Sequence, residues 1–403
     1  MKFDMVKSAS TPNYLKKCIL NTLICGAFLV TPFKATAAEE VLNVEAEAAI
    51  LMEAQTGQIL FEQNADEALP PASLTKIMTL TVAMEALEEG KADWEDQVTI
   101  SQKAHETGGS QMFLNYDQEV PFRELIKGIA IVSANDACVA VAEHLSGSKE
   151  AFVEQMNQQA EEIGLNNSSF TNASGLHHDE HYMSAKDVAK LSRYLINHHP
   201  EASELQAETE FTVSSEYIHG EQEISQENRN PLLDNYSGAD GIKTGWTPEA
   251  GHSLAGTAER NDMRFISVVM NADDNEARKI ESEKLLDYGF DHHQYHYVAY
   301  EGESVDKMEV YRGDKDYVSL QATKDLKVVV PQGEEENLTV DILPLEKPEA
   351  PIEKGTELAE ISISYQGEKL LDSFLTAEEN IERLGFLAHA WDQIVNFLRD
   401  LWD

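Results

Sequence analysis

Three short polar motifs follow one another along this chain. They are Ser73-Leu74-Thr75-Lys76, Ser133-Ala134-Asn135 and Lys243-Thr244-Gly245. The pattern Ser-x-x-Lys alone carries little information, because it also occurs at 146–149 and 304–307. The three motifs are informative as a set. Their order, their spacing of about 60 and about 110 residues, and the element predicted under each distinguish this set from chance matches. The set therefore predicts one site assembled from three separate parts of the chain.

The pattern around the motifs predicts an α/β (α+β) domain with strands at both ends and helices between them. Pro70-Pro71 precedes a helical pattern over 72–88, whose apolar residues recur at the spacing of a buried helix. Residues 48–62 alternate around Gln55-Thr56-Gly57, which is typical of a hairpin. Further helices are expected at 122–132, 136–145, 150–163 and 184–197, and strands at 241–244, 253–257 and 264–271. The second motif thus lies between two helices and the third on a strand edge.

The first two motifs have the residue types of a nucleophile and the groups that move its proton. Ser73 and Lys76 are three residues apart on a helix and therefore share one face. A serine hydroxyl needs a base, and partial burial near other cations would lower the pKa of Lys76 enough for that role. Ser133 and Asn135, on a turn, would relay a proton and hold a substrate amide. Taken singly, the two serines and the asparagine are explained as helix caps.

The third motif has the residue types that bind an anionic substrate terminus alongside a strand. Lys243 supplies positive charge, Thr244 a hydroxyl, and Gly245 lets a substrate backbone approach closely. The backbone N–H groups of Ser73 and Trp246 would then point at a developing oxyanion. Arg229 lies upstream and would pair with a carboxylate, the alternative being a surface salt bridge.

Residues 1–37 have the order of a secretory signal peptide. Lysines precede a short apolar stretch at 19–30, and Ala35-Thr36-Ala37 offers a cleavage site before Ala38. The stretch is too short for a lasting transmembrane anchor, although an uncleaved N-terminal anchor is the alternative. We therefore expect an exported, extracytoplasmic protein.

Charge and cysteine content exclude several classes of function. The net charge of −41 repels nucleic acid and anionic lipid, and the acidity is spread along the chain. One hypothesis is a solvated surface suited to high salt or high pH. Cys18 and Cys25 would leave with the signal, which excludes an internal disulfide framework. Cys138 lies in an apolar run, so we expect a small buried core residue rather than a nucleophile.

The sequence character changes near 287–291, which predicts a catalytic domain over 38–290 and a small all-β domain over 291–376. Short β-rich runs separated by turn signals occur at 307–311, 318–320, 326–330, 338–342 and 360–365. No motif in this second domain carries chemistry, so a spacer or docking role is expected.

Residues 377–403 contain an apolar stripe at helical spacing. Its members are Ile381, Leu384, Leu387, Trp391, Ile394, Val395, Leu398, Leu401 and Trp402. We favour an amphipathic helix that lies on the outer face of the cytoplasmic membrane. The alternative is a helix packed on the protein's own core or on a partner chain. Acidic residues beside the stripe weaken the membrane interpretation, because interfacial helices favour Lys and Arg.

The segment Leu176-His177-His178-Asp179-Glu180-His181 invites a metal interpretation. It lacks the carboxylate–histidine signature of a known zinc enzyme. We therefore expect a surface loop before the helix at 184–197, and neither a metal nor a cofactor.

On these motifs the chain resembles the D-alanyl-D-alanine carboxypeptidases, low-molecular-mass penicillin-binding proteins of bacterial cell walls, over nearly all of 40–403. Further matching segments are Pro71-Ala72-Ser73, Val132-Ser133-Ala134-Asn135-Asp136-Ala137, Asn172-Ala173-Ser174-Gly175-Leu176, Asp240-Gly241-Ile242-Lys243, Gly256-Thr257-Ala258-Glu259-Arg260 and Ala350-Pro351-Ile352-Glu353-Lys354-Gly355. The resemblance implies a transpeptidase/β-lactamase-like domain with an antiparallel five-stranded sheet and helices, then the all-β domain and the C-terminal amphipathic helix.

The resemblance also implies an activity and its residues. The penultimate D-alanine of a peptidoglycan stem peptide would acylate Ser73 with loss of the last D-alanine, and β-lactam antibiotics would inhibit by acylating the same serine. Lys76 would be the base, with Ser133 and Asn135 completing the proton path and substrate binding. Lys243, Thr244 and Arg229 would recognise the terminal carboxylate. Two residues depart from the pattern of this family, namely the bulky Trp246 and Pro231 after Asn230, and they would alter the mouth of the site.

Three other functions remain as alternatives. A class A β-lactamase would add a glutamate that activates the deacylating water, and no such glutamate can be assigned. A wall endopeptidase would use the same chemistry on cross-links. A non-catalytic wall-binding scaffold would have a decayed site, whereas all three motifs are intact.

Overall fold

The computed structural model describes residues 42–218 and 222–384. The predicted signal peptide at 1–37 lies outside these residues, as does most of the predicted C-terminal helix. Among the described residues, no helix combines the length and apolarity needed to cross a bilayer.

The first part of the described chain carries all of its α-helices. Its elements are β1 (Ala48–Glu53), β2 (Ile59–Gln63), η1 (Ala72–Thr75), α1 (Lys76–Glu88), β3 (Gln97–Thr99), α2 (Gln102–His105), β4 (Glu119–Pro121), α3 (Phe122–Ala130), α4 (Asn135–Ser146), α5 (Lys149–Ile163), α6 (Ala185–His198), α7 (Pro200–Gln206), β5 (Glu210–Val213), β6 (Ile224–Glu227), α8 (Leu232–Asn235), β7 (Ala239–Thr247), β8 (Gly251–Arg260), β9 (Met263–Ala272) and α9 (Asn275–His292). The expected hairpin, helices and meander are therefore confirmed to within a few residues.

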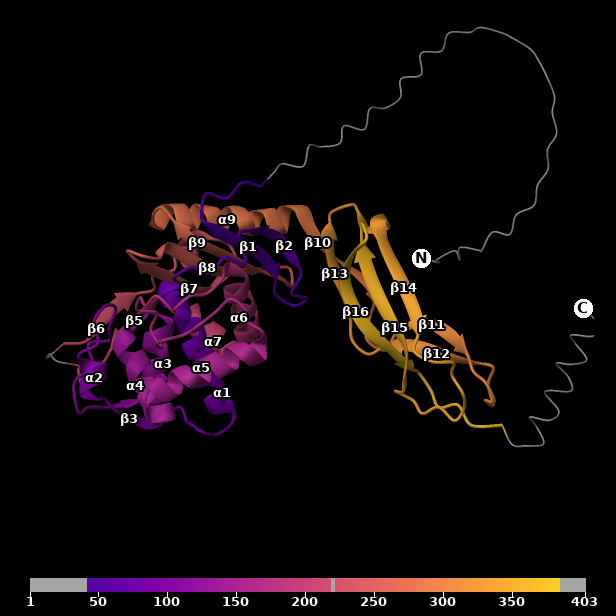
Figure 1. The fold of residues 1–403 in the computed structure, drawn as a ribbon, viewed down its shortest axis with the longest axis horizontal. Coiled ribbons are helices and arrows are strands. Elements are labelled where there is room, and N and C mark those ends of the chain that lie inside the picture. Colours follow the sequence, from indigo (N-terminus) through magenta and orange to yellow (C-terminus); the bar gives the residue numbers. More distant parts are fainter. Residues whose placement is uncertain (1–41, 219–221, 385–403) are drawn as a thin grey trace, which may run out of the picture. The chain divides into compact units, whose positions relative to one another are not determined.

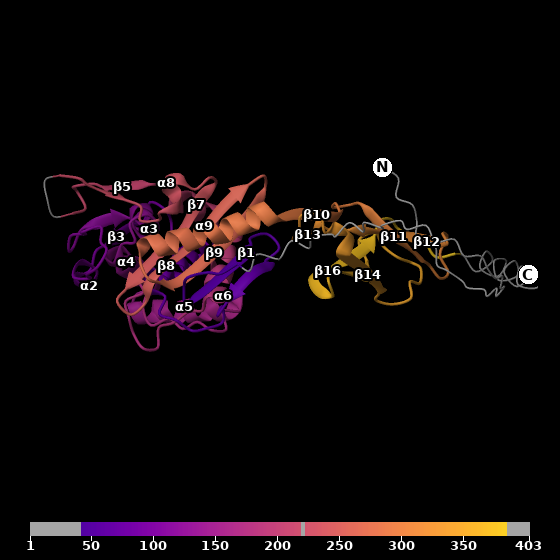
Figure 2. The same cartoon turned by 90° about the horizontal axis from the view of Figure 1, so that it is seen from above.

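A five-stranded antiparallel sheet organises this part, in the order β2-β1-β9-β8-β7. The helix α9 packs on β8 and β9, and α6 packs on β1 and β9, so helices lie on both faces of the sheet (Figures 1 and 2). The strand β7, which carries the third motif, is at the edge of the sheet. One side of its backbone is thus left for another extended chain to pair with.

The helix α1 lies inside the helical layer, where it contacts α3, α4, α5 and α6. Leu74, Ile77 and Met78 are fully buried in the main core. The burial of these apolar residues confirms the buried helix that their spacing predicted.

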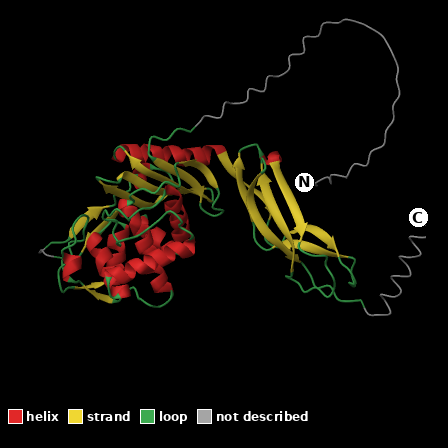
Figure 3. Cartoon of the chain, viewed as in Figure 1, coloured by secondary structure: helices red, strands yellow, loops and turns green. Residues whose placement is uncertain are grey.

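The second part of the described chain is all-β apart from the short turn η2 (Glu335–Asn337), as Figure 3 shows. Its strands are β10 (His293–Ala299), β11 (Ser304–Glu309), β12 (Tyr317–Ala322), β13 (Leu326–Pro331), β14 (Leu338–Pro344), β15 (Glu357–Tyr365) and β16 (Glu368–Ala377). Five of them form a sheet in the order β11-β12-β16-β15-β14, and β10 pairs with β13. The sequence analysis did not predict β10 or β16.

The helix α9 was also not predicted. A local signal for its start exists, because the carboxylate of Asp274 accepts a hydrogen bond of 2.8 Å from the backbone N–H of Ala277. This is N-cap geometry, and an acidic residue follows in the first turn. The first domain was expected to end in strands, and no helix was expected between the strand at 264–271 and the change of character at 287–291.

The predicted stripe of the C-terminal helix is wrong at its first residue. Ile381 is 1% exposed, belongs to the core of the all-β part, and pairs with Ile352 in a short antiparallel bridge. The backbone N–H of Leu384 likewise donates to the carbonyl of Arg312 at 3.0 Å. Long-range pairing thus overrides helical spacing here, and the rest of the stripe lies outside the described residues.

Candidate active site

The first motif places its serine and lysine side by side. Ser73 lies in η1, and Lys76 is the first residue of α1. The ammonium nitrogen of Lys76 is 2.9 Å from the Ser73 hydroxyl and 2.6 Å from the carbonyl oxygen of Ser174. Lys76 is fully buried, and this burial lowers its pKa to about 8. The pair therefore combines a hydroxyl with an amine that loses its proton near neutral pH.

The loop that supplies the Ser174 carbonyl is shaped by one asparagine. The carboxamide oxygen of Asn172 accepts hydrogen bonds from the backbone N–H groups of Ser174, Gly175 and Leu176 at 3.1, 2.8 and 3.1 Å. Gly175 has a φ of +83°, and a Cβ there would lie 1.7 Å from the carbonyl oxygen of Ala72. Only glycine allows the loop to lie this close to the turn that holds Ser73.

The second motif lies on the turn between α3 and α4. Ser133 has a φ of +64°, is 3% exposed, and its hydroxyl has no hydrogen-bond partner among the described residues. Asn135 is tied to the loop in front of it: its backbone N–H donates to the Ser110 carbonyl at 2.7 Å, and its side chain to the Gly108 carbonyl at 2.8 Å. The left-handed turn thus presents a hydroxyl that is free to bond to another group.

The next residue, Asp136, was not singled out by the sequence analysis. Its buried carboxylate accepts hydrogen bonds from the backbone N–H groups of Met112 and Ala137 at 3.0 Å and of Leu114 at 3.2 Å. Burial raises the pKa of this carboxyl. Asp136 thus ties residues 112–114, in the loop between α2 and β4, to the start of α4. The Asn135 side chain is bonded to the same loop through the Gly108 carbonyl.

The third motif lies in β7, next to the turn that carries the serine. Lys243 and Thr244 are 3% and 6% exposed. Burial and the neighbouring Lys76 charge lower the pKa of Lys243 well below its ordinary value. A Cβ at Gly245 would lie 2.8 Å from the Pro71 carbonyl oxygen. The glycine therefore allows close packing of β7 on η1, rather than only the close approach of a substrate that we expected.

A buried arginine behind β7 was missed. Arg278, on α9, is 6% exposed and donates hydrogen bonds of 3.0 Å to the backbone carbonyls of Gly245 and Ser253. Burial, together with the nearby positive charge of Arg229, lowers its pKa to about 10. A single arginine on an unpredicted helix gives no local signal of this role.

All of the predicted site residues except the buried Lys76 and Lys243 line one cleft. Its lining comprises Ser73, Gly109, Ser110, Ser133, Asn135, Ser174, Gly175, Leu176, Arg229, Thr244, Gly245, Trp246, Thr247, Pro248, His252 and Arg278. Arg229 donates a 2.7 Å hydrogen bond to the Ser110 hydroxyl, in place of the surface salt bridge considered for it. Trp246 is 56% exposed. The cleft thus combines the Ser73 hydroxyl with those of Ser133 and Thr244 and with the cations Arg229 and Arg278, an arrangement suited to acyl transfer from an anionic substrate.

The prediction of a surface loop at the histidine segment is wrong for its last residue. His177 and His178 are exposed, but His181 is 2% exposed and its Nε2 lies 2.7 Å from the Thr75 hydroxyl of the first motif. Among the described residues, no group of three or more His, Cys, Asp or Glu side chains is arranged to hold a metal ion. Cys138 is buried as expected, and burial raises the pKa of its thiol to about 11.

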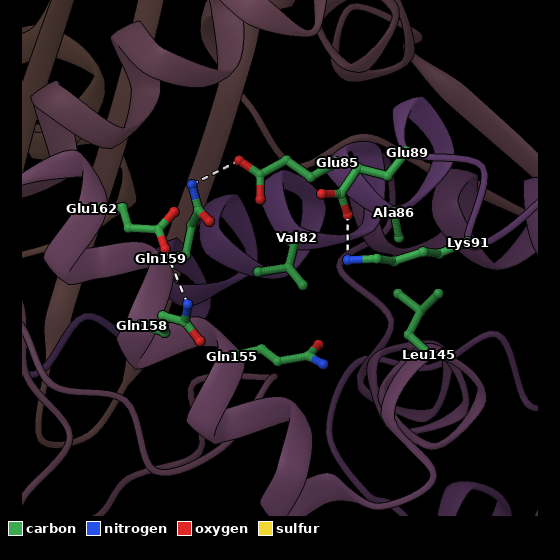
Figure 4. Close-up of a pocket in the computed structure, with 10 residues that line it drawn as sticks. All are labelled: Val82, Glu85, Ala86, Glu89, Lys91, Leu145, Gln155, Gln158, Gln159 and Glu162. Atoms are coloured by element: carbon green, nitrogen blue, oxygen red, sulfur yellow. Dashed lines mark hydrogen bonds and ion pairs between the residues drawn. The ribbon is translucent and has the colours of Figure 1, made fainter.

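Another pocket lies between α1, α4 and α5 and contains none of the three motifs (Figure 4). Glu85 accepts hydrogen bonds there from Gln159 at 2.7 Å and from Tyr194 at 2.9 Å, and Lys91 pairs with Glu89 at 2.5 Å. These polar groups satisfy one another, so the pocket holds no reactive constellation comparable to the cleft.

Comparison with known families gives two matches. Residues 34–274 match the family described as D-alanyl-D-alanine carboxypeptidase, and residues 294–383 match the C-terminal domain of penicillin-binding protein 5. The first match covers the three motifs, and the second covers the strands from β11 to β16.

Individual relatives match over almost the whole chain. The D-alanyl-D-alanine carboxypeptidase DacF of Bacillus subtilis is 37% identical over 92% of this chain and 96% of its own. DacC of Escherichia coli is 37% identical over 91% and 92%. The crystal structure of penicillin-binding protein 5 from Haemophilus influenzae matches with a TM-score of 0.77 and 34% identity, over 85% of this chain and 98% of that one. Penicillin-binding protein D2 of Listeria monocytogenes, solved in its ampicillin-bound form, matches with a TM-score of 0.55 and 33% identity over 62% of this chain and 98% of that one.

Proposed function

The chain belongs to the D-alanyl-D-alanine carboxypeptidase family, as a serine-type enzyme of that activity, and we propose that Ser73 is its nucleophile. The observation that carries this assignment is the 2.9 Å contact between the Ser73 hydroxyl and the buried Lys76 amine. A lysine with a pKa of about 8 is partly unprotonated at neutral pH and can accept the serine proton. The substrate is peptidoglycan, so the enzyme works outside the cytoplasm.

In the acylation step, the Ser73 oxygen attacks the carbonyl carbon of the penultimate D-alanine and its proton passes to Lys76. The backbone N–H groups of Ser73 and Trp246 stabilise the oxyanion. The Ser133 hydroxyl then passes a proton from Lys76 to the nitrogen of the last D-alanine, which leaves as the amine. The unpartnered, buried Ser133 hydroxyl supports this relay.

Deacylation reverses the proton path. A water molecule gives its proton to the same lysine and attacks the ester carbonyl of the acyl-enzyme. The ester bond breaks, the Ser73 oxygen takes the proton back, and the shortened peptide leaves with a new terminal carboxylate. Asn135 holds the substrate amide throughout, which the fixed position of its side chain on the Gly108 carbonyl supports.

The substrate carboxylate is recognised at the other end of the cleft. We assign this role to Lys243, Thr244 and Arg229, because Thr244 and Arg229 line the cleft and Lys243 directly precedes Thr244 in β7. Gly245 allows β7 to lie against the serine turn. Trp246 forms an exposed wall of the mouth. The edge position of β7 leaves room for the stem peptide to pair alongside it.

An intact-mass time course with penicillin, followed by peptide mapping, tests the nucleophile. We expect one long-lived adduct on Ser73, loss of the adduct in Ser73→Ala, and no effect of the control Ser304→Ala, which changes the same four-residue pattern in the all-β part. The unmodified enzyme and Ser304→Ala should release D-alanine from a peptide ending in D-Ala-D-Ala, whereas Ser73→Ala should not. Release by Ser73→Ala would show that the nucleophile is another residue.

The alternative functions give different results. Fast turnover of penicillin without an accumulating adduct would indicate a β-lactamase. Cleavage of a cross-linked stem-peptide dimer faster than release of terminal D-alanine would indicate an endopeptidase. A folded protein that forms no adduct and releases no D-alanine would be a wall-binding scaffold.

We propose that the chain is exported by its first 37 residues and that its C-terminal segment associates with the outer face of the cytoplasmic membrane. The domain boundaries near 290 and 376 belong to the same proposal. Because Ile381 is part of the β core, a deletion that tests the segment should begin at 385. Deleting 385–403 should release the protein from membranes while D-alanine release continues. Unchanged sedimentation with membranes would contradict the membrane association. A mature N-terminal residue other than Ala38 would contradict the proposed cleavage site.

A further inference from the structure

One buried imidazole connects the two segments that hold Lys76. His181 lies between the loop at 172–176 and α6, and its Nε2 is 2.7 Å from the Thr75 hydroxyl. Its Nδ1 is 3.1 Å from the backbone nitrogen of Thr171. The ring also packs edge-on against Phe170, with 5.8 Å between ring centroids.

The hydrogen bonds define which ring nitrogen carries the proton. A backbone N–H can only donate, so Nδ1 must accept the bond from Thr171 with a lone pair. The proton of the neutral ring is therefore on Nε2, which donates to the Thr75 hydroxyl. A second proton on Nδ1 would break the bond to Thr171.

The two ring nitrogens contact the two segments that position the Lys76 ammonium. At one end, Thr75 directly precedes Lys76 in the chain. At the other, Thr171 directly precedes Asn172, whose carboxamide oxygen shapes the loop that places the Ser174 carbonyl 2.6 Å from the lysine nitrogen. The ring therefore ties the turn that carries the lysine to the loop that holds its ammonium group.

We propose that His181, as the neutral Nε2–H tautomer, is a positioning residue that keeps the Lys76 amine on the Ser73 hydroxyl in a dry environment. This inference rests on the proposed roles of Ser73 and Lys76. Without the ring, the loop and the turn separate, water reaches the lysine, and its proton affinity rises towards that of an exposed amine. The charged or titratable groups that act on the ring are His178, His177 and Lys76.

The test compares three variants of the full chain, measured by penicillin acylation and D-alanine release between about pH 6 and pH 10. His181→Leu removes both hydrogen bonds, His181→Gln retains a donor and an acceptor, and Glu180→Gln changes an exposed side chain of the same loop that is not among the groups acting on the ring. We expect His181→Leu to lower kcat by about 10- to 100-fold with KM changed by less than about threefold, because the groups displaced are those that react. The pH of half-maximal acylation should move upward.

The matched variants decide whether the effect is more than lost packing. Partial recovery of kcat and of the pH midpoint in His181→Gln, with no change in Glu180→Gln, would support the positioning role. A folded His181→Leu enzyme with the original kcat and pH midpoint would overturn it. If His181→Leu does not fold, Thr75→Val removes the accepting hydroxyl alone and should move the midpoint in the same direction, and an unmoved midpoint there would overturn the inference too.

The outcomes also separate this inference from the proposed function. Absence of a Ser73 adduct in the unmodified enzyme contradicts the proposed nucleophile. A normal Ser73 adduct in the unmodified enzyme, with identical rates in His181→Leu, contradicts only the role of His181.

Discussion

The amine of Lys76 and the hydroxyl of Ser73 lie 2.9 Å apart across the boundary between the protein core and the cleft. Lys76 is fully buried, whereas Ser73 is partly exposed and lines the cleft. The lysine thus experiences the desolvation of the core while the serine stays accessible to substrate. This placement leads to a specific dependence of the reaction on pH.

Acylation should accelerate with pH up to about 8 and then level off. Burial lowers the pKa of Lys76 to about 8, and only its unprotonated form accepts the serine proton. Below this pKa the reactive fraction changes about tenfold per pH unit, so the second-order rate constant with penicillin should do the same. Stopped-flow or mass measurements between about pH 6 and pH 9 would show this limb. A rate that stays constant from pH 6 to pH 8 would contradict the role of Lys76 as the base.

Gly175→Ala should unfold the surroundings of the serine turn. The new Cβ would lie 1.7 Å from the Ala72 carbonyl oxygen, so either the loop or the turn must move. We expect a loss of about 3 kcal/mol or more in the free energy of unfolding, with slow penicillin acylation. Gly164→Ala is the matched control, because Gly164 has a similar φ of +79° with no atom within 4 Å of a Cβ. The control should lose about 1–2 kcal/mol and acylate normally. Equal losses in urea titrations of the two variants would contradict the close approach.

Arg278→Ala should destabilise the domain and disturb β7. The substitution leaves the carbonyls of Gly245 and Ser253 without their 3.0 Å donor, at about 1–3 kcal/mol for each buried group. Lys279→Ala, one residue along α9, removes only a 4.0 Å ion pair to Glu283 and should cost about 0.5 kcal/mol or less. Urea unfolding measures both. Similar stability of the two variants would mean that the arginine does not support the strand.

Lowering the pH from about 6.5 to about 4 should destabilise the folded protein through its buried histidines. Burial lowers the pKa of His181 to about 4, and burial also lowers those of His199 and His293. At these three histidines the unfolded chain therefore binds more protons than the folded one between about pH 6.5 and pH 4, so their contribution to stability falls as pH falls through this window. Each such proton contributes a slope of up to about 1.4 kcal/mol per pH unit. His181→Gln should reduce the slope of unfolding free energy against pH, and Glu180→Gln, an exposed change in the same loop, should leave it unchanged. A slope that is the same in both variants would contradict a buried neutral His181.

Salt should stabilise this protein. A net charge of −41 creates repulsion across the surface, and raising the ionic strength from about 0.1 M to about 1 M shortens the screening length from about 10 Å to about 3 Å. We expect the melting temperature in sodium chloride to rise over this range. A melting temperature and an activity that do not respond to salt or to alkaline pH would exclude adaptation of the surface to high salt or high pH.

Elements set by local pattern were predictable. The hairpin of β1 and β2, the helix α1 and the meander of β7 to β9 follow from periodicity within one turn or one strand. The spacing of three residues placed Ser73 and Lys76 on one face, because helix geometry alone decides it. The resemblance to a known family gave the remaining motif roles and the five-stranded sheet.

Contacts between distant residues were decided by the packing of the whole domain. The Ser174 carbonyl on Lys76, His181 on Thr75 and Arg278 behind Gly245 all join segments that are far apart in the chain. Ile381 shows the same principle in the all-β part, where a bridge to Ile352 takes the place of the helical turn expected at this residue. Periodicity reports only which face of an element is apolar, whereas these contacts depend on which faces meet. The chemistry of the site could therefore be read from residue types and their order, but the groups that hold its lysine in place could be seen only in the folded domain.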